Sequence, residues 1–180
     1  MSVQGNSKRQ KAASMGPTPQ IERHLADLSD NSPSGFAIAF HIRFTTPAFL
    51  FQTYAQPWLD LYSAKGLVMH DPIVKFGFTE TGWARWSDLA RNDPADVLGQ
   101  AAAHGLRYGL AFALEAEGSR SLAGLARPDR EFTDDEIARI TGTVTDLHLI
   151  TLEAGSLSPE ANDELKRMSV KFTHPSRDNA

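Results

Sequence analysis

The sequence contains no cysteine among its 180 residues. This absence excludes disulfide bonds, thiolate metal sites and a cysteine nucleophile. No apolar run approaches the roughly 18 residues that a membrane-spanning helix needs. The N-terminal segment also lacks the apolar core of a signal peptide. These absences make a cytoplasmic protein without membrane contact the simplest expectation.

The sequence also lacks a net positive charge. The formal net charge is −4 and the sequence pI is about 5.8. A nucleic-acid-binding domain normally carries a strongly basic surface, so we predict no direct nucleic-acid binding by this chain. The apolar content of 41% is sufficient for one globular domain with a core.

The motifs that signal catalysis or cofactor binding are missing as well. No serine lies in a G-x-S-x-G setting. The six histidines form no H-x-x-x-H pair and have no nearby carboxylate cluster suited to zinc. The glycines form neither a Walker nor a Rossmann loop. We therefore predict that the protein is not an enzyme and has no catalytic residue, metal site or cofactor.

The most distinctive stretch covers residues 54–88. It contains all three tryptophans, two of the three tyrosines and the step Asp71-Pro72. Trp58 and Tyr62 are four residues apart, which places both on one face of a helix. Asp71 before Pro72 is typical of an N-cap followed by the first residue of a second, short helix.

Two interpretations of these aromatic side chains are open on spacing alone. Aromatic stripes at helical spacing usually belong to a core, and Asp71 would then be only a helix cap. Rings with a polar tip can also pack against an apolar ligand and hydrogen-bond to it. Asp71 follows an apolar run, and a buried carboxylate needs hydrogen-bond donors.

Four segments have the pattern of β-strands. Residues 35–45 alternate, with phenylalanines and isoleucines on one face and Ala37, Ala39 and His41 on the more polar face. We expect His41 to be a solvated or core-edge histidine without a chemical role. Residues 48–54, 108–117 and 121–127 complete the set, with turns between them that favour hairpins.

Helices are expected before, between and after these strands. Thr18 before Pro19, and Asp93 before Pro94, are typical helix starts. Thr133 and Glu136 form a capping box at the start of the last long helix. Hairpins covered by helices predict an α+β fold with a central antiparallel β-sheet.

The spacing of Tyr54, Trp58, Tyr62, Asp71-Pro72 and Trp86 resembles the autoinducer-binding domain of LuxR-type quorum-sensing regulators. The resemblance runs from about residue 21 to about residue 152. It implies an α/β/α sandwich, with the central sheet covered by helices on both faces. It also implies a homodimer and a small-molecule autoinducer, an N-acyl homoserine lactone.

The resemblance also implies roles for individual residues. Trp58 is expected to donate its indole N–H to the lactone carbonyl, and Asp71 to accept from the amide N–H. Tyr54 is expected to donate to the acyl carbonyl, while Tyr62 and Trp86 form walls of the pocket. Indole offers only a donor and an ionised carboxylate only acceptors, which suits these roles.

The chain departs from the family pattern at two places. Some members have threonine where this chain has Ile73, and many have serine or threonine on the last strand, where this chain has 123–126, AGLA. Ile73 therefore belongs to the expected pocket as an apolar residue. Fewer polar contacts put a preference for oxo or hydroxy acyl chains in doubt.

The expected domain organisation has three parts. Residues 1–17 form a disordered lead, 18–154 the autoinducer-binding domain, and 155–180 a C-terminal helix and loose tail that resembles the start of a DNA-binding domain. The chain is then the sensor part of a longer regulator, or a short homologue that inhibits full-length regulators by heterodimerisation. The initial methionine and the absence of an evident tag favour the short homologue.

Overall fold

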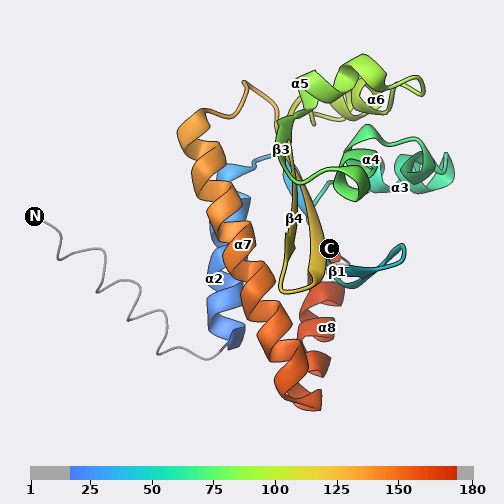
Figure 1. Ribbon diagram of the computed structural model, residues 1–180. Coiled ribbons are helices and arrows are strands. Elements are labelled where there is room, and N and C mark those ends of the chain that lie inside the picture. Colours follow the sequence, from blue (N-terminus) through green and yellow to red (C-terminus); the bar gives the residue numbers. More distant parts are fainter. Residues whose placement is uncertain (1–16, 174–180) are drawn as a thin grey trace, which may run out of the picture.

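The computed structural model describes residues 17–173 and has three layers (Figure 1). A five-stranded antiparallel sheet in the order β2-β1-β5-β4-β3 lies in the middle. Helices α2 and α7 cover one face, and α3 to α6 lie on the other (Figure 1). This arrangement confirms the predicted α+β sandwich. The predictions for residues 1–16 and 174–180 lie outside the described residues.

The strands are β1 (Gly35–Arg43), β2 (Thr46–Gln52), β3 (Gly82–Arg85), β4 (Tyr108–Ala116) and β5 (Ser119–Arg127). The α-helices are α2 (Pro17–Asn31), α3 (Gln56–Ala64), α4 (Pro72–Thr79), α5 (Trp86–Leu89), α6 (Val97–Ala103), α7 (Asp134–Leu157) and α8 (Pro159–Thr173). Two short 3-10 turns are η1 (Leu67–Met69) and η2 (Ala90–Asn92). Among the described residues, no helix is both long and apolar enough to cross a membrane.

The face of the sheet toward α2 and α7 holds the main core. Phenylalanine, leucine and isoleucine side chains of the strands pack there against Ile21, Leu25 and Leu28 of α2 and against the apolar stripe of α7. The predicted capping box at Thr133 is present, and it fixes the start of α7. The opposite face carries small residues at most positions of β1, β4 and β5, and a smaller cluster around Trp58 and Trp86 covers it.

The alternation of β1 breaks at a bulge, so the predicted face of His41 was wrong. The register of β1 against β5 shifts between Ala39 and Ile42, and His41 has a φ of 55°. The extra residue turns His41 toward the helix face, where it is buried. Ile42 then faces the opposite side of the sheet, and Phe44 at the hairpin tip is fully exposed.

Two other elements differ from expectation. The fifth strand, β3, was not predicted, because its four residues are too short to show alternation. Helix α6 begins at Val97, three residues after the predicted start at Pro94. Asp93 still supplies the cap, since its carboxylate accepts the backbone N–H groups of Val97 and Leu98 at 3.0 and 2.8 Å.

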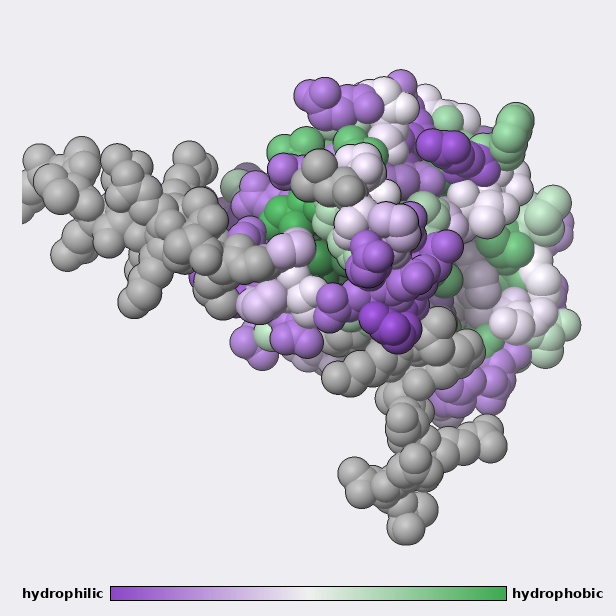
Figure 2. All heavy atoms as spheres, turned by 90° about the horizontal axis from the view of Figure 1, so that it is seen from below, coloured by the Kyte–Doolittle hydropathy of each residue, from purple (hydrophilic) through white to green (hydrophobic). Residues whose placement is uncertain are grey.

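Helix α8 packs along the outer edge strand β2 and joins the main core through Leu165 and Met168. The Ser169 hydroxyl exchanges hydrogen bonds with the backbone N–H and C=O of Leu50 on β2. These contacts cover part of a strand edge that would otherwise expose unpaired backbone groups. Seen from below (Figure 2), this end of the molecule carries mostly hydrophilic side chains, and hydrophobic ones lie in small separate groups.

We expect Gly109→Ala to destabilise the fold by about 1–3 kcal/mol, because overpacking a filled site forces its neighbours to shift. A Cβ at Gly109 would lie 1.9 Å from Cδ2 of Trp86, whose indole rests on β4. The matched control is Gly142→Ala on an exposed turn of α7, where a Cβ meets nothing within 4 Å. Alanine there favours the helix, so thermal unfolding should show opposite shifts. Equal shifts of the two variants would contradict this packing.

Candidate ligand-binding site

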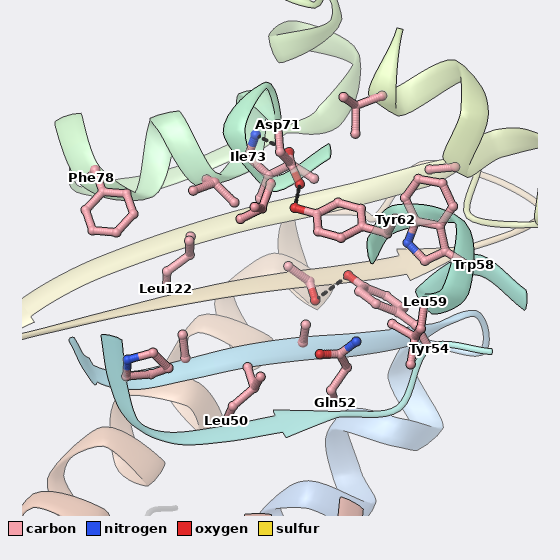
Figure 3. Close-up of a pocket in the computed structure, with 18 of the residues that line it drawn as sticks. Leu50, Gln52, Tyr54, Trp58, Leu59, Tyr62, Asp71, Ile73, Phe78 and Leu122 are labelled. Atoms are coloured by element: carbon pink, nitrogen blue, oxygen red, sulfur yellow. Dashed lines mark hydrogen bonds between the residues drawn. The ribbon is translucent and has the colours of Figure 1, made fainter. Parts of the chain in front are cut away.

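A cavity of about 280 Å³ lies between the small-residue face of the sheet and helices α3 and α4 (Figure 3). All six residues expected at the site line it: Tyr54, Trp58, Tyr62, Asp71, Ile73 and Trp86. Tyr54 lies between β2 and α3, Trp58 and Tyr62 lie on α3, and Trp86 begins α5. Asp71 is the N-cap of α4, and Ile73 lies in its first turn. The structure therefore brings together every residue that the aromatic and Asp-Pro pattern singled out.

Asp71 is the buried carboxylate of the cavity. Its Oδ1 accepts the backbone N–H of Ile73 at 2.8 Å, which is the predicted N-cap of α4. Its Oδ2 accepts the hydroxyl of Tyr62 at 2.7 Å (Figure 3). Burial raises the pKa of Asp71, while these hydrogen bonds oppose the shift. Each carboxylate oxygen has two lone pairs, so Oδ2 can accept one further hydrogen bond from the cavity.

The position of Asp71 depends on how α4 is held against β5. Arg120 of β5 donates to the carbonyl oxygens of Gly77 and Glu80 at 2.9 and 2.7 Å, which satisfies the C-terminal end of α4. A Cβ at Gly77 would lie 2.4 Å from Leu122, so glycine permits the close approach of helix and sheet. Sheet and helix together therefore fix Asp71 at the N-terminus of α4.

Both tyrosine hydroxyls already donate within the protein. Tyr62 donates to Asp71, and Tyr54 donates to the backbone carbonyl of Gly124 at 2.9 Å. Burial, with the nearby Asp71 carboxylate adding to it, raises the pKa of Tyr54 and of Tyr62 well above its ordinary value. Each hydroxyl therefore stays protonated and has a single proton to donate.

The two buried tryptophans differ in what they offer the cavity. Trp58 has no hydrogen-bond partner among the described residues, and its indole nitrogen lies on the side of the ring toward Tyr62 and the cavity (Figure 3). The indole nitrogen of Trp86 also has no hydrogen-bond partner among the described residues. This nitrogen is fully buried, so a ligand in the cavity cannot reach it. Trp58 can therefore act as a donor, whereas Trp86 forms a wall.

The cavity is polar at one end and apolar at the other. Tyr54, Trp58 and Asp71 gather at one end, while Phe78 lies at the far end (Figure 3). The apolar part is formed by aliphatic and aromatic side chains: Ala39, Ile42, Pro47, Leu50, Val74, Phe78 and Leu122. Such a site suits an amphiphilic molecule with a hydrogen-bonding head and a hydrocarbon chain.

Two polar residues that line the cavity were not expected from the sequence, Thr45 at the exposed hairpin tip and Gln52. Gln52 of β2 lines the cavity between Leu50 and Tyr54 (Figure 3). Residues two apart on a strand share a face, so the alternation of β2 already placed Gln52 beside Tyr54. The sequence alone does not tell which residue of 123–126 faces the cavity. In the structure, Gly124 lines it. Within the described residues, no cluster of side chains suited to a metal ion is present.

Comparison with known proteins identifies the family. A family model described as the autoinducer binding domain matches residues 36–155. The chain belongs to the autoinducer-binding domains of LuxR-type regulators. This is a family of ligand-binding regulator domains and not of enzymes.

Individual relatives agree with this membership. The transcriptional activator SolR of Ralstonia nicotianae is 30% identical over 95 residues, which cover 52% of this chain and 40% of SolR. The autoinducer-binding domain described here thus spans less than half of that relative. Two solved structures share its fold. SdiA of Escherichia coli has a TM-score of 0.63 and 17% identity over 84% of this chain and 68% of SdiA. CepR2 of Burkholderia cenocepacia has a TM-score of 0.54 and 20% identity over 74% of this chain and 80% of CepR2.

The raised pKa of Asp71 predicts how the ligand-free autoinducer-binding domain responds to pH. Because the folded pKa lies above the ordinary value of 3.8, the wild type loses stability as pH rises from that value through the folded pKa. Asp71→Asn keeps a capping oxygen and cannot ionise. The melting temperature of Asp71→Asn should therefore rise relative to wild type between pH 4 and pH 7. A constant difference across that range would contradict a raised pKa.

Proposed function

We propose that this domain binds an N-acyl homoserine lactone and acts as a quorum-sensing signal receptor. The observation that carries the proposal is the pairing of a free indole donor, Trp58, with a buried carboxylate acceptor, Asp71, at one end of an apolar cavity. The lactone carbonyl requires a donor and the amide N–H an acceptor. The acyl chain requires apolar walls, which the rest of the cavity supplies.

Asp71 is the centre of this proposal, because its buried charge lacks a cationic partner among its described neighbours. Burying a carboxylate is unfavourable unless it is well hydrogen-bonded. A ligand N–H would add a third hydrogen bond to those from Tyr62 and Ile73. Binding would then lower the pKa of Asp71 and offset part of the cost of burying its charge.

Tyr54 can bind the ligand only if its hydroxyl gives up a hydrogen bond that it makes within the protein. Its hydroxyl proton is used by the carbonyl of Gly124. To donate to the acyl carbonyl of a ligand, Tyr54 has to exchange that acceptor for the ligand oxygen. The exchange conserves one hydrogen bond, provided that the Gly124 carbonyl finds another donor. Tyr62, Ile73 and Trp86 then serve as walls around the lactone and the first carbons of the chain.

Relatives bind more than one kind of amphiphile. CepR2 is described as dependent on N-acyl homoserine lactone, and SdiA has been solved in complex with octanoyl-rac-glycerol. The Asp71 carboxylate can accept from the amide N–H of an acyl homoserine lactone and equally from a free hydroxyl of a monoacylglycerol. The choice of the lactone for this chain therefore rests on its membership of the autoinducer-binding family and on the ligand dependence of CepR2. Action in the cytoplasm as a homodimer belongs to the same proposal. Inhibition of full-length regulators by mixed pairing stays a prediction.

Asp71→Asn should weaken binding of octanoyl homoserine lactone by about 2 kcal/mol, or roughly 30-fold, because a charged acceptor is lost. The measurement is isothermal titration, with thermal melts to establish that each variant is folded. The matched control is Asp60→Asn on α3, an exposed aspartate that accepts from Gln56 outside the cavity. Its affinity should equal that of the wild type. Unchanged binding by folded Asp71→Asn would falsify the assigned role.

A further inference from the structure

The polar groups inside the cavity differ in whether they are free to bind a ligand. The hydroxyl protons of Tyr54 and Tyr62 are used by Gly124 and Asp71. Trp58 is free, and the proposed function assigns it to the head group. Two lining residues remain whose side chains have no hydrogen-bond partner among the described residues, Gln52 and Thr45. Thr45 is exposed at the hairpin tip, so Gln52 is the free donor on the floor of the cavity. An unpaired amide in an apolar site is costly, which marks it for interaction with a ligand or water.

Strand register fixes where along the cavity Gln52 lies. Gln52 pairs with Ala37 across β1 and β2, and Ala37 pairs with Gly124 across β1 and β5. All three line the cavity, so they form one cross-strand row on its floor. The hydroxyl of Tyr54 reaches the carbonyl of Gly124, so it belongs to this row as well.

The next row toward the far end is entirely apolar. Leu50 pairs with Ala39, and Ala39 pairs with Leu122. Gln52 therefore lies between the head-group residues and the hydrocarbon part of the cavity (Figure 3). In a ligand that extends along the strands from Trp58 toward Phe78, the carbons next to the head group would lie beside Gln52.

Small side chains give a ligand access to Gln52. Because Ala37 and Gly124 have little or no side chain, they leave space above the sheet beside Gln52. A Cβ at Gly124 would lie 3.2 Å from the Tyr54 hydroxyl. Serine or threonine at position 124 would therefore crowd Tyr54 as well as fill the row. This chain has its free polar group on the same face of the sheet, two strands away from position 124, on β2.

We propose that Gln52 is the residue that determines specificity for an oxygen on the third carbon of the acyl chain. This inference rests on the proposed function. An acyl chain with a 3-oxo or 3-hydroxy group presents two neighbouring oxygens, on its first and third carbons. Tyr54 serves the first oxygen, and the Gln52 amide, which both donates and accepts, serves either form of the second. Beyond that carbon, the apolar row favours an unsubstituted chain.

The test is titration of the whole chain with octanoyl, 3-oxo-octanoyl and 3-hydroxyoctanoyl homoserine lactone. The wild type should bind the two oxygenated ligands about tenfold more tightly than the unsubstituted one, as expected for one neutral hydrogen bond. Gln52→Met keeps a similar side-chain length and cannot form this bond. It should abolish the tenfold difference and leave affinity for the octanoyl ligand within about threefold.

The matched control is Leu50→Met, which lies on the same strand and the same face, in the apolar row. It should retain the wild-type preference. A preference that survives in Gln52→Met overturns the assignment of Gln52. Equal losses for all three ligands overturn it too, because Gln52 would then bind an oxygen common to all of them. If the folded wild type binds none of the three, the proposed function fails, and this inference fails with it.

Discussion

The cavity exists because side-chain volume is divided unequally between the two faces of the sheet. Alternation sends the phenylalanines and most leucines of β1, β2, β4 and β5 toward α2 and α7. The positions between them carry mainly alanine and glycine, as at Ala37, Ala39 and Gly124. A sheet face without bulk cannot fill the space below α3 and α4, so a cavity remains there. A cavity lowers the free energy of unfolding, and the densely packed core on the opposite face of the sheet offsets this loss.

The same division explains why a charged group can lie in the middle of the domain. Asp71 caps α4, and α4 approaches β5 closely because Gly77 leaves room for Leu122. The carboxylate is thereby fixed above a floor of small residues, where a ligand can reach it. Its hydrogen bonds to Ile73 and Tyr62 offset only part of the cost of burial, which is why its pKa is raised. A donor from a ligand would offset more of this cost.

Local chemistry made much of this architecture predictable. Four of the five strands, the cap at Asp71 and the capping box at Thr133 follow from spacing and from turn residues. The gathering of six residues around one site was implied by the family resemblance, because spacing alone also allowed a core. The failures have long-range causes. The bulge at His41 is set by pairing with β5, and the start of α6 by where the Asp93 carboxylate finds its donors. The Gln52 amide lacks a hydrogen-bond partner because none of its neighbours in the cavity offers one. These neighbours come from distant parts of the chain, so a local sequence pattern cannot predict it.

A network of hydrogen bonds on the helix face of the sheet links β1 and β5 to α7. Nε2 of His148 donates to the carbonyl of Ala116, and its Nδ1 is hydrogen-bonded to the Ser121 hydroxyl. The Thr151 hydroxyl donates to the helix carbonyl four residues earlier, so it accepts from Nε2 of His41. Nε2 of each imidazole therefore carries a proton, and the two ring centroids lie 4.8 Å apart.

Burial, and to a lesser degree His148, lowers the pKa of His41 to about 4. The stability that its neutral form provides is present above its ordinary pKa of 6.5 and is lost as pH falls through that range. Ser121, which bonds α7, directly precedes Leu122, which lines the cavity. The network that locks α7 to β5 therefore also fixes the strand against which the ligand lies.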